Sequence, residues 1–205
     1  MAKILHVQAS PRGERSASTA VAKEFLAAYQ KNNPGDTVET LDIWHTDLPE
    51  FDGEALNAKY AVMTGQDFTP GQQTAWNVVT TMAEHFKSAD KLIFSLPMWN
   101  FGIPYRLKQY FDVIAQPGLL FGFAPDKGYF GLVTGKKAVA IYASGGLYAP
   151  GSGAEAFDLQ SKYLKLFLGF VGVSDVKDIF VGGTAMNKDA VATGKLQAVE
   201  VAVAF

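Results

Sequence analysis

Hydroxyl side chains gather in the first loop of the chain, where they could bind an anion. Residues 10–18 read SPRGERSAS and lie between a short apolar run and a helical pattern. Hydroxyls and backbone N–H groups at the start of a helix favour a negatively charged group. A simpler alternative is that Ser16 or Ser18 only caps the helix. Because three serines and a glycine share this loop, we expect it to bind a phosphate monoester, with Arg12 and Arg15 either adding charge or facing solvent.

Two later loops carry groups that suit a flat aromatic ligand. Residues 97–104 place a tryptophan, an asparagine and a phenylalanine directly after an apolar run. Such side chains can contact a ring and its polar rim. Residues 143–148 read ASGGLY, and adjacent glycines let backbone N–H groups approach a ring carbonyl. Viewed alone, the aromatic residues of 97–104 could simply belong to the hydrophobic core, and residues 143–148 could form an ordinary tight turn.

Other kinds of active site have little support in the sequence. The chain has no cysteine, which excludes disulfides, thiolate nucleophiles and iron–sulfur clusters. No segment matches a nucleoside-triphosphate loop or the G-x-S-x-G motif of hydrolases. The three histidines are scattered, so we expect no metal site. Residues 151–156 match the loose dinucleotide pattern G-x-G-x-x-A, but their distance from the preceding strand favours an ordinary loop.

The spacing of apolar residues alternates along the chain between strand-like and helix-like patterns, which predict the elements that position these loops. Apolar runs typical of buried strands cover residues 4–7, 37–43, 91–96, 138–142 and 176–181. Helical spacing covers residues 21–29, 69–87, 104–115, 155–170 and 188–203. Residues 44–68 read as irregular and 117–134 as a hairpin or flap. Strands that alternate with helices predict one α/β domain over residues 1–205 with a parallel sheet, and ligands of such sheets bind beyond the carboxyl ends of the strands.

Composition narrows the class of protein further. The chain has 205 residues, 48% of them apolar, and 18 basic against 20 acidic side chains give a formal net charge of −2. This is enough for one substantial core and too apolar for a disordered chain. The near-neutral balance gives no electrostatic footprint for nucleic acid. No apolar stretch approaches the ~20 residues of a membrane span, and the start of the chain does not resemble an export signal. We therefore expect a cytoplasmic protein without a nucleic-acid or membrane partner.

Taken together, these loops resemble the flavodoxin-like NAD(P)H:quinone and azo-dye reductases, specifically the bacterial FMN-dependent azoreductase family. The resemblance covers nearly the whole chain. It rests on Ser10 with residues 16–18, on residues 97–101, on residues 132–137 leading to 144–146, and on residues 163–170. It implies a flavodoxin-like fold, with a five-stranded parallel sheet of order 2-1-3-4-5 and helices on both faces. It also implies a homodimer whose active site lies at the interface, with one FMN per subunit.

The resemblance further implies a role for each loop. The expected cofactor-binding residues are Ser10, Ser16, Ala17 and Ser18 at the phosphate, Pro97, Met98, Trp99, Asn100 and Phe101 along the isoalloxazine, and Ala143, Ser144, Gly145 and Gly146 at its pyrimidine edge. The expected substrate-binding residues are Phe121, Phe123, Tyr148 and Phe167. Phe121, Phe123 and Phe167 would cover the flavin of the partner subunit, with ordinary helix core as the alternative for Phe167. The chain departs from the family pattern at Ala17, Trp99 and Ser144.

The activity implied is transfer of hydride from NADH or NADPH through FMN to quinones or azo compounds by a ping-pong mechanism. The cofactor carries this chemistry, so we expect no catalytic side chain. The main alternative is a non-enzymatic electron carrier of the flavodoxin type. Flavodoxins are typically shorter and more acidic, so the net charge of −2 favours the enzyme. An FMN reductase that feeds oxygen or iron, and a nucleotide-sensing module without turnover, are further alternatives.

Overall fold

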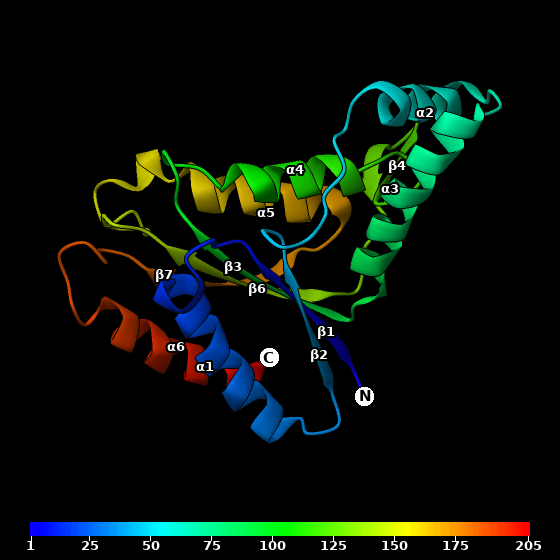
Figure 1. Cartoon of the computed structure of the whole chain (residues 1–205). Helices are drawn as coiled ribbons and strands as arrows, with labels where there is room; N and C mark the ends of the chain where they lie inside the picture. The colour runs from blue at the N-terminus through cyan, green and yellow to red at the C-terminus, as the bar shows by residue number, and fades with distance from the viewer.

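A five-stranded parallel sheet forms the centre of the molecule (Figure 1). The computed structural model describes all 205 residues. The strands are β1 (Lys3–Gln8), β2 (Thr37–Asp42), β3 (Lys91–Pro97), β6 (Lys137–Ala143) and β7 (Asp175–Val181). Their spatial order is β2-β1-β3-β6-β7, which is 2-1-3-4-5 when only strands of this sheet are counted. The predicted fold class is therefore confirmed.

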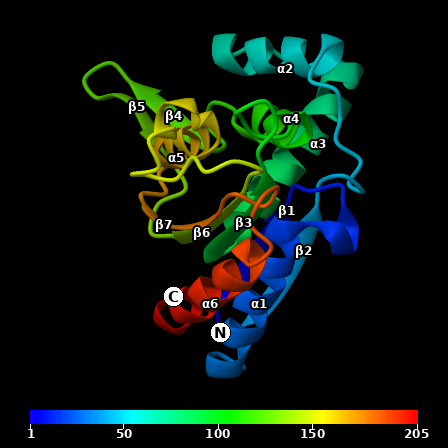
Figure 2. The ribbon, with the colours of Figure 1, turned by 90° about the vertical axis from the view of Figure 1, so that its left-hand side faces the viewer.

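Helices cover both faces of the sheet, as the turned view in Figure 2 shows. On one face, α1 (Ala17–Asn32) lies beside α6 (Ala190–Ala204). The other face carries α3 (Pro70–Ser88), α4 (Tyr105–Ile114) and α5 (Leu159–Val171). Two short 3-10 turns, η1 (Gly13–Arg15) and η2 (Glu155–Phe157), lie ahead of α1 and α5. None of these helices is both long and apolar enough to cross a membrane.

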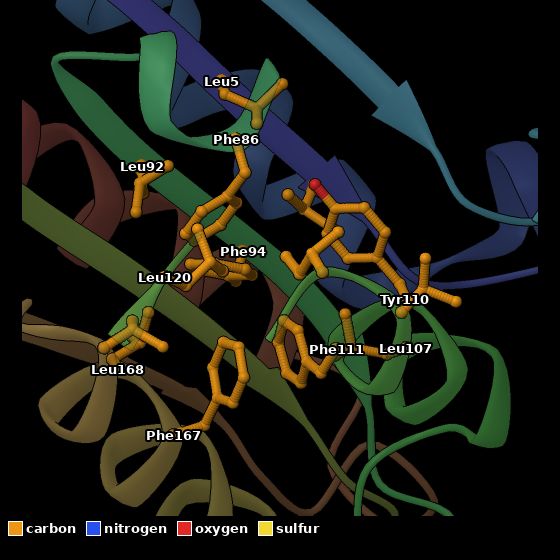
Figure 3. Close-up of a cluster of buried hydrophobic side chains, with 14 of the residues drawn as sticks. Leu5, Phe86, Leu92, Phe94, Leu107, Tyr110, Phe111, Leu120, Phe167 and Leu168 are labelled. Atoms are coloured by element: carbon orange, nitrogen blue, oxygen red, sulfur yellow. The ribbon is translucent and has the colours of Figure 1, made fainter. Parts of the chain in front are cut away.

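The strands are apolar on both faces because helices bury both of them. Successive side chains of a strand point to opposite faces, so Ile93 joins the smaller core cluster while Leu92 and Phe94 join the larger one. Figure 3 shows the larger cluster, in which the rings of Phe111 and Phe167 face each other. Their centroids are 3.8 Å apart and their planes differ by 15°. This contact ties α5 to α4 over the sheet.

Residues 44–68 contain a helix that the sequence reading missed, α2 (Gly53–Thr64), which packs on α3. The expectation of an irregular stretch was wrong here. The buried face of α2 consists of Ala55, Ala58 and Ala61, and alanine gives little hydrophobic contrast along the sequence. The predicted start of α3 at Thr69 is confirmed, since Thr69 caps the helix and Pro70 is its first residue. The structure adds a capping box between Thr69 and Gln72.

Residues 117–134 form the expected hairpin, with β4 (Phe121–Ala124) paired antiparallel to β5 (Gly128–Gly131). The hairpin projects from the side of the sheet that carries α5 (Figure 2). It lies close to the end of α5 because Gly131 has no side chain. A Cβ atom at this position would fall 2.2 Å from the backbone nitrogen of Gly172.

Candidate functional site

One cavity of about 340 Å³ opens at the carboxyl edge of the sheet, between four strand-to-helix loops. The parallel register brings these loops together, because Pro97 pairs with Ala143 and Ala143 with Val181. Its volume is that of a small-molecule site. It is lined by Ser10, Arg12, Ser16, Ala17, Ser18, Pro97, Met98, Trp99, Ala143, Ser144, Gly145, Thr184 and Ala185.

Buried hydroxyls and free backbone donors form the end of the cavity at α1. Ser10 and Ser18 are 2% and 0% exposed. Ser16 caps α1, since its Oγ accepts the backbone N–H of Thr19 at 3.2 Å. Capping therefore occurs, but it uses only this hydroxyl, and the N–H groups of Ala17 and Ser18 donate to no protein atom. Donors that lack a protein acceptor at a helix start favour an anion.

The loop after β3 makes a tight turn of unusual backbone conformation. Trp99 and Gly102 exchange backbone hydrogen bonds of 3.0 and 2.9 Å. Between them, Asn100 and Phe101 have φ of 48° and 70°, the left-handed conformation that both central residues of a type I′ turn require. Such a conformation is costly for residues other than glycine and persists where neighbouring structure fixes it.

The start of α5 fixes this turn from outside the cavity. The backbone N–H of Leu159 donates to the carbonyl oxygen of Phe101 at 3.0 Å. The side-chain amide of Gln160, which is buried, donates to the carbonyl oxygen of Leu96 at 3.1 Å. The turn is thus held at its tip and at the strand that leads into it.

The loop after β7 forms a fourth wall that the sequence reading missed. Thr184 donates twice to the carbonyl oxygen of Ser144, from its backbone N–H at 3.1 Å and from its hydroxyl at 3.0 Å. The N–H of Gly183 donates to the carbonyl oxygen of Gly146 at 2.8 Å. These bonds hold the glycine loop with the N–H groups of Gly145 and Gly146 free of protein acceptors. The sequence did carry one signal for this loop, because Gly182 and Gly183 directly follow the strand predicted over residues 176–181.

An aromatic cluster adjoins the cavity on the side of β2. The ring centroids of Trp44 and Trp99 are 5.5 Å apart, and Tyr105 lies 5.3 Å from Trp44 and 6.0 Å from Trp99. The indole N–H of Trp44 donates to the carbonyl oxygen of Ala9 at 3.1 Å. Trp44 therefore links the first loop to the loop after β3. It falls in the stretch that the sequence predicted to be irregular.

Some predicted binding residues do not line the cavity. Asn100, Phe101 and Gly146 belong to its loops without lining it. Tyr148 lies 6.2 Å from Phe101 between ring centroids and lines a neighbouring cavity.

The aromatic residues predicted to cover a partner's flavin lie outside the chain's own cavity. Phe121 and Phe123 belong to the hairpin, where Phe123 is 61% exposed. Phe167 is 8% exposed and packs on Phe111 in the core. Their role toward a second subunit stays a prediction.

A neutral histidine lies in the sheet close to the site. His6 is 2% exposed, and its Nε2 lies 2.9 Å from the hydroxyl oxygen of Ser95, two residues before Pro97. Burial lowers the pKa of His6 to about 4, against the smaller opposing effect of the Asp42 carboxylate. The imidazole is therefore neutral at pH 7. Arg12 is the one charged residue that lines the cavity.

Comparison with known proteins agrees with this geometry. A family model described as having the flavodoxin-like fold matches residues 2–204. An FMN-dependent NADH:quinone oxidoreductase from Nitratidesulfovibrio vulgaris is 47% identical, over 98% of this chain and 96% of that protein. Another from Desulfotalea psychrophila is 43% identical, over 98% and 97%. The crystal structure of an FMN-dependent NADH-azoreductase from Bacillus anthracis in complex with FMN superimposes with a TM-score of 0.89 at 29% identity, over 99% and 98% of the two chains. The chain therefore belongs to the flavodoxin-like fold family and, within it, to the family of FMN-dependent NADH:quinone oxidoreductases.

Proposed function

We propose that this chain binds FMN and passes reducing equivalents from NADH to a quinone or azo compound. The observation that carries the proposal is the convergence of four loops on one cavity, where the backbone N–H groups of Ala17, Ser18, Gly145 and Gly146 have no protein acceptor. Relatives named for this activity match the chain over almost its full length. Quinones are the more plausible natural acceptors on chemical grounds, and the names of the relatives favour NADH.

The donors of the cavity fit the chemical groups of FMN. Hydroxyls and the free N–H groups of Ala17 and Ser18 suit the phosphate. The free N–H groups of Gly145 and Gly146 suit the carbonyl oxygens of the pyrimidine edge. Between them, the loop after β3 offers an apolar wall that suits a flat ring. We assign the predicted cofactor-binding residues accordingly, with Asn100, Phe101 and Gly146 acting through the backbone of their loops.

The residues of this chain bind and orient the reactants. FMN, when bound, supplies the chemistry by accepting a hydride from NADH and passing two electrons to the acceptor in a ping-pong cycle. No His, Asp, Glu, Lys or Tyr side chain lines the cavity, so no lining group is of a kind that commonly exchanges protons at neutral pH. The N–H groups of Gly145 and Gly146 would stabilise negative charge at the edge of the ring. Trp99 and Met98 would exclude water from the ring's face.

We propose that a second copy of the chain completes the site. Exposed aromatic rings lie in two places, with Trp99 and Phe101 in the loop after β3 and Phe123 and Tyr129 on the hairpin. We propose that these rings pack against the second copy, because exposed large apolar side chains mark interaction sites where they gather. Phe121 and Phe123 of one subunit would cover the flavin of the other. The contact of Phe167 with Phe111 favours the core alternative for Phe167.

A visible spectrum tests the function. The protein is mixed with FMN, desalted and treated with NADH without oxygen. We expect a retained flavin band that bleaches at once and returns when benzoquinone is added. A retained band that responds to neither NADH nor NADPH would instead indicate an electron carrier. Failure to bind FMN at tens of micromolar would refute the proposal.

A further inference from the structure

Trp44 contacts two walls of the cavity, although it does not line the cavity itself. Its indole N–H donates to the carbonyl oxygen of Ala9, which directly precedes Ser10 in the first loop. Its ring lies against that of Trp99, in the loop after β3, with 5.5 Å between the centroids and 51° between the planes. Aromatic rings at this separation stabilise each other beyond the area that they bury. Trp44 therefore joins two loops of the site from behind.

The backbone around Trp44 is held by protein groups alone. On either side of it, the guanidinium of Arg106 at the start of α4 donates to the carbonyl oxygens of Ile43 at 3.2 Å and Thr46 at 2.7 Å. The backbone N–H of Trp44 donates to the carboxylate of Asp42 at 3.0 Å. A planar guanidinium that bonds to two carbonyls keeps them in one geometry. The position of Trp44 therefore does not depend on a ligand.

The indole of Trp99 depends on its neighbours more than that of Trp44 does. Trp99 is 37% exposed, and of the tryptophans only Trp44 bonds to a protein atom through its indole N–H. The rings next to Trp99 are those of Trp44 and Tyr105, the latter with its centroid 6.0 Å away. Tyr105 is 63% exposed, whereas Trp44 is half-buried and hydrogen-bonded. Trp44 is thus the firmer of the two supports.

We infer that Trp44 is a positioning residue that holds the indole of Trp99 at the wall of the cavity after β3. The inference rests on the proposed function and deepens it, because it names a residue outside the cavity that acts on the flavin through Trp99. A side chain that is already fixed loses little freedom when a ligand arrives. Loss of an aromatic pair of this kind corresponds to roughly a 3- to 10-fold change in affinity.

Fluorescence of Trp99 in the flavin-free protein tests the positioning directly. Two double variants leave Trp99 as the only tryptophan of the chain, because each combines Trp76→Phe with either Trp44→Phe or Trp44→Leu. Phenylalanine keeps a ring against Trp99 and leucine does not. We therefore expect acrylamide to quench Trp99 about twofold more strongly, and its anisotropy to be lower, in the variant with Trp44→Leu. Equal quenching and equal anisotropy would show that Trp44 does not hold Trp99.

Flavin affinity of the full-length protein tests whether this support matters for binding. The Kd of FMN is measured by quenching of flavin fluorescence. We expect Trp44→Leu to raise this Kd about 3- to 10-fold. Trp44→Phe keeps a ring and loses the bond to Ala9, so a smaller rise is expected. In a protein that already carries Trp99→Leu, adding Trp44→Leu should change the Kd less than about twofold, because Trp44 acts through Trp99.

Trp76→Leu provides the matched control. Trp76 belongs to the core cluster against which Trp44 packs, is 8% exposed and does not line the cavity. Its ring lies 6.4 Å from that of Phe68. The same substitution at this buried position should lower the melting temperature at least as much as Trp44→Leu does. We expect the Kd of FMN to stay within about twofold of the wild type.

Three results of the titrations would overturn the inference. Equal losses of FMN affinity in Trp44→Leu and Trp76→Leu would mean that Trp44 contributes only to stability. Additive losses in Trp44→Leu and Trp99→Leu would mean that Trp44 does not act through Trp99. An unchanged Kd in Trp44→Leu would mean that the support has no effect on the flavin. Failure of the wild type to bind FMN would refute the proposed function itself, whereas the quenching of Trp99 tests the support without flavin.

Discussion

Lowering the pH tests the neutral state of the buried His6. The fold binds the imidazole uncharged, because burial lowers its pKa from 6.5 to about 4. The unfolded chain takes up the proton near pH 6.5. Between pH 6.5 and about 4 the unfolded state therefore binds more protons than the folded state, and the free energy of unfolding falls as the pH falls. The full stability is present above pH 6.5.

The size of the loss follows from the two pKa values. At about 1.4 kcal/mol per pH unit, the difference between 6.5 and about 4 corresponds to roughly 3 kcal/mol once the folded imidazole is also protonated. About 2 kcal/mol of this is lost between pH 7 and pH 5. The pKa values of Glu39, Asp36 and Glu14 are lowered in the fold, so their contribution is lost mainly below this window, as the pH falls through the range in which carboxylates titrate.

Urea unfolding at pH 7 and pH 5 measures the effect on the protein without FMN. We expect the wild type to lose about 2 kcal/mol over this interval and His6→Gln to lose much less, because glutamine cannot titrate and its amide can still bond to Ser95. His85→Gln serves as the control, since His85 lies outside the core beside Glu39 and its removal leaves His6 in place. Equal pH-dependent losses in the wild type and His6→Gln would show that the reasoning from burial is wrong.

Three further predictions concern the packing around the site. Thr184→Val removes a hydroxyl at nearly constant volume and frees the glycine loop, so it should weaken FMN binding roughly 5-fold. Thr184→Ser keeps the hydroxyl and should bind FMN like the wild type. Equal FMN affinities of the wild type and both variants in a flavin titration would contradict the role of the hydroxyl. Gln160→Leu and Gln116→Leu each remove a buried amide that donates to a carbonyl, so both should lower the melting temperature. Of the two glutamines, only Gln160 holds the turn after β3, so only Gln160→Leu should shift the reduction potential of bound FMN. Phe167→Ala should destabilise the fold by about 3–5 kcal/mol in urea unfolding by removing the ring stacked on Phe111; a loss below about 1 kcal/mol would mean that Phe167 is not core.

The sequence predicted the sheet well because its information is local. Each strand is a short apolar run, and the alternation with helices together with the resemblance determined the strand order. The start of α3 was visible because Pro70 follows the capping residue Thr69. In α2 the same approach failed, because a face of Ala55, Ala58 and Ala61 carries no strong period.

The missed parts of the site depend on contacts between distant segments. Thr184 and Ala185 reach the cavity because α6 packs beside α1 under the sheet, which brings the loop after β7 back toward the first loop. The link from Trp44 to Ala9 also spans two loops. The left-handed backbone of Asn100 and Phe101 could not be predicted, because asparagine tolerates this conformation without requiring it and phenylalanine rarely adopts it.

The loops of the cavity are held in place from two sides. On one face of the sheet, the start of α5 fixes the turn after β3 through Gln160 and Leu159. At the far edge, Thr184 fixes the glycine loop after β6. Because the free N–H groups of Gly145 and Gly146 belong to a backbone that other bonds already hold, a ligand that binds them orders little additional chain. Variants at Gln160, which does not line the cavity, should therefore change the environment of bound flavin without removing a contact to it.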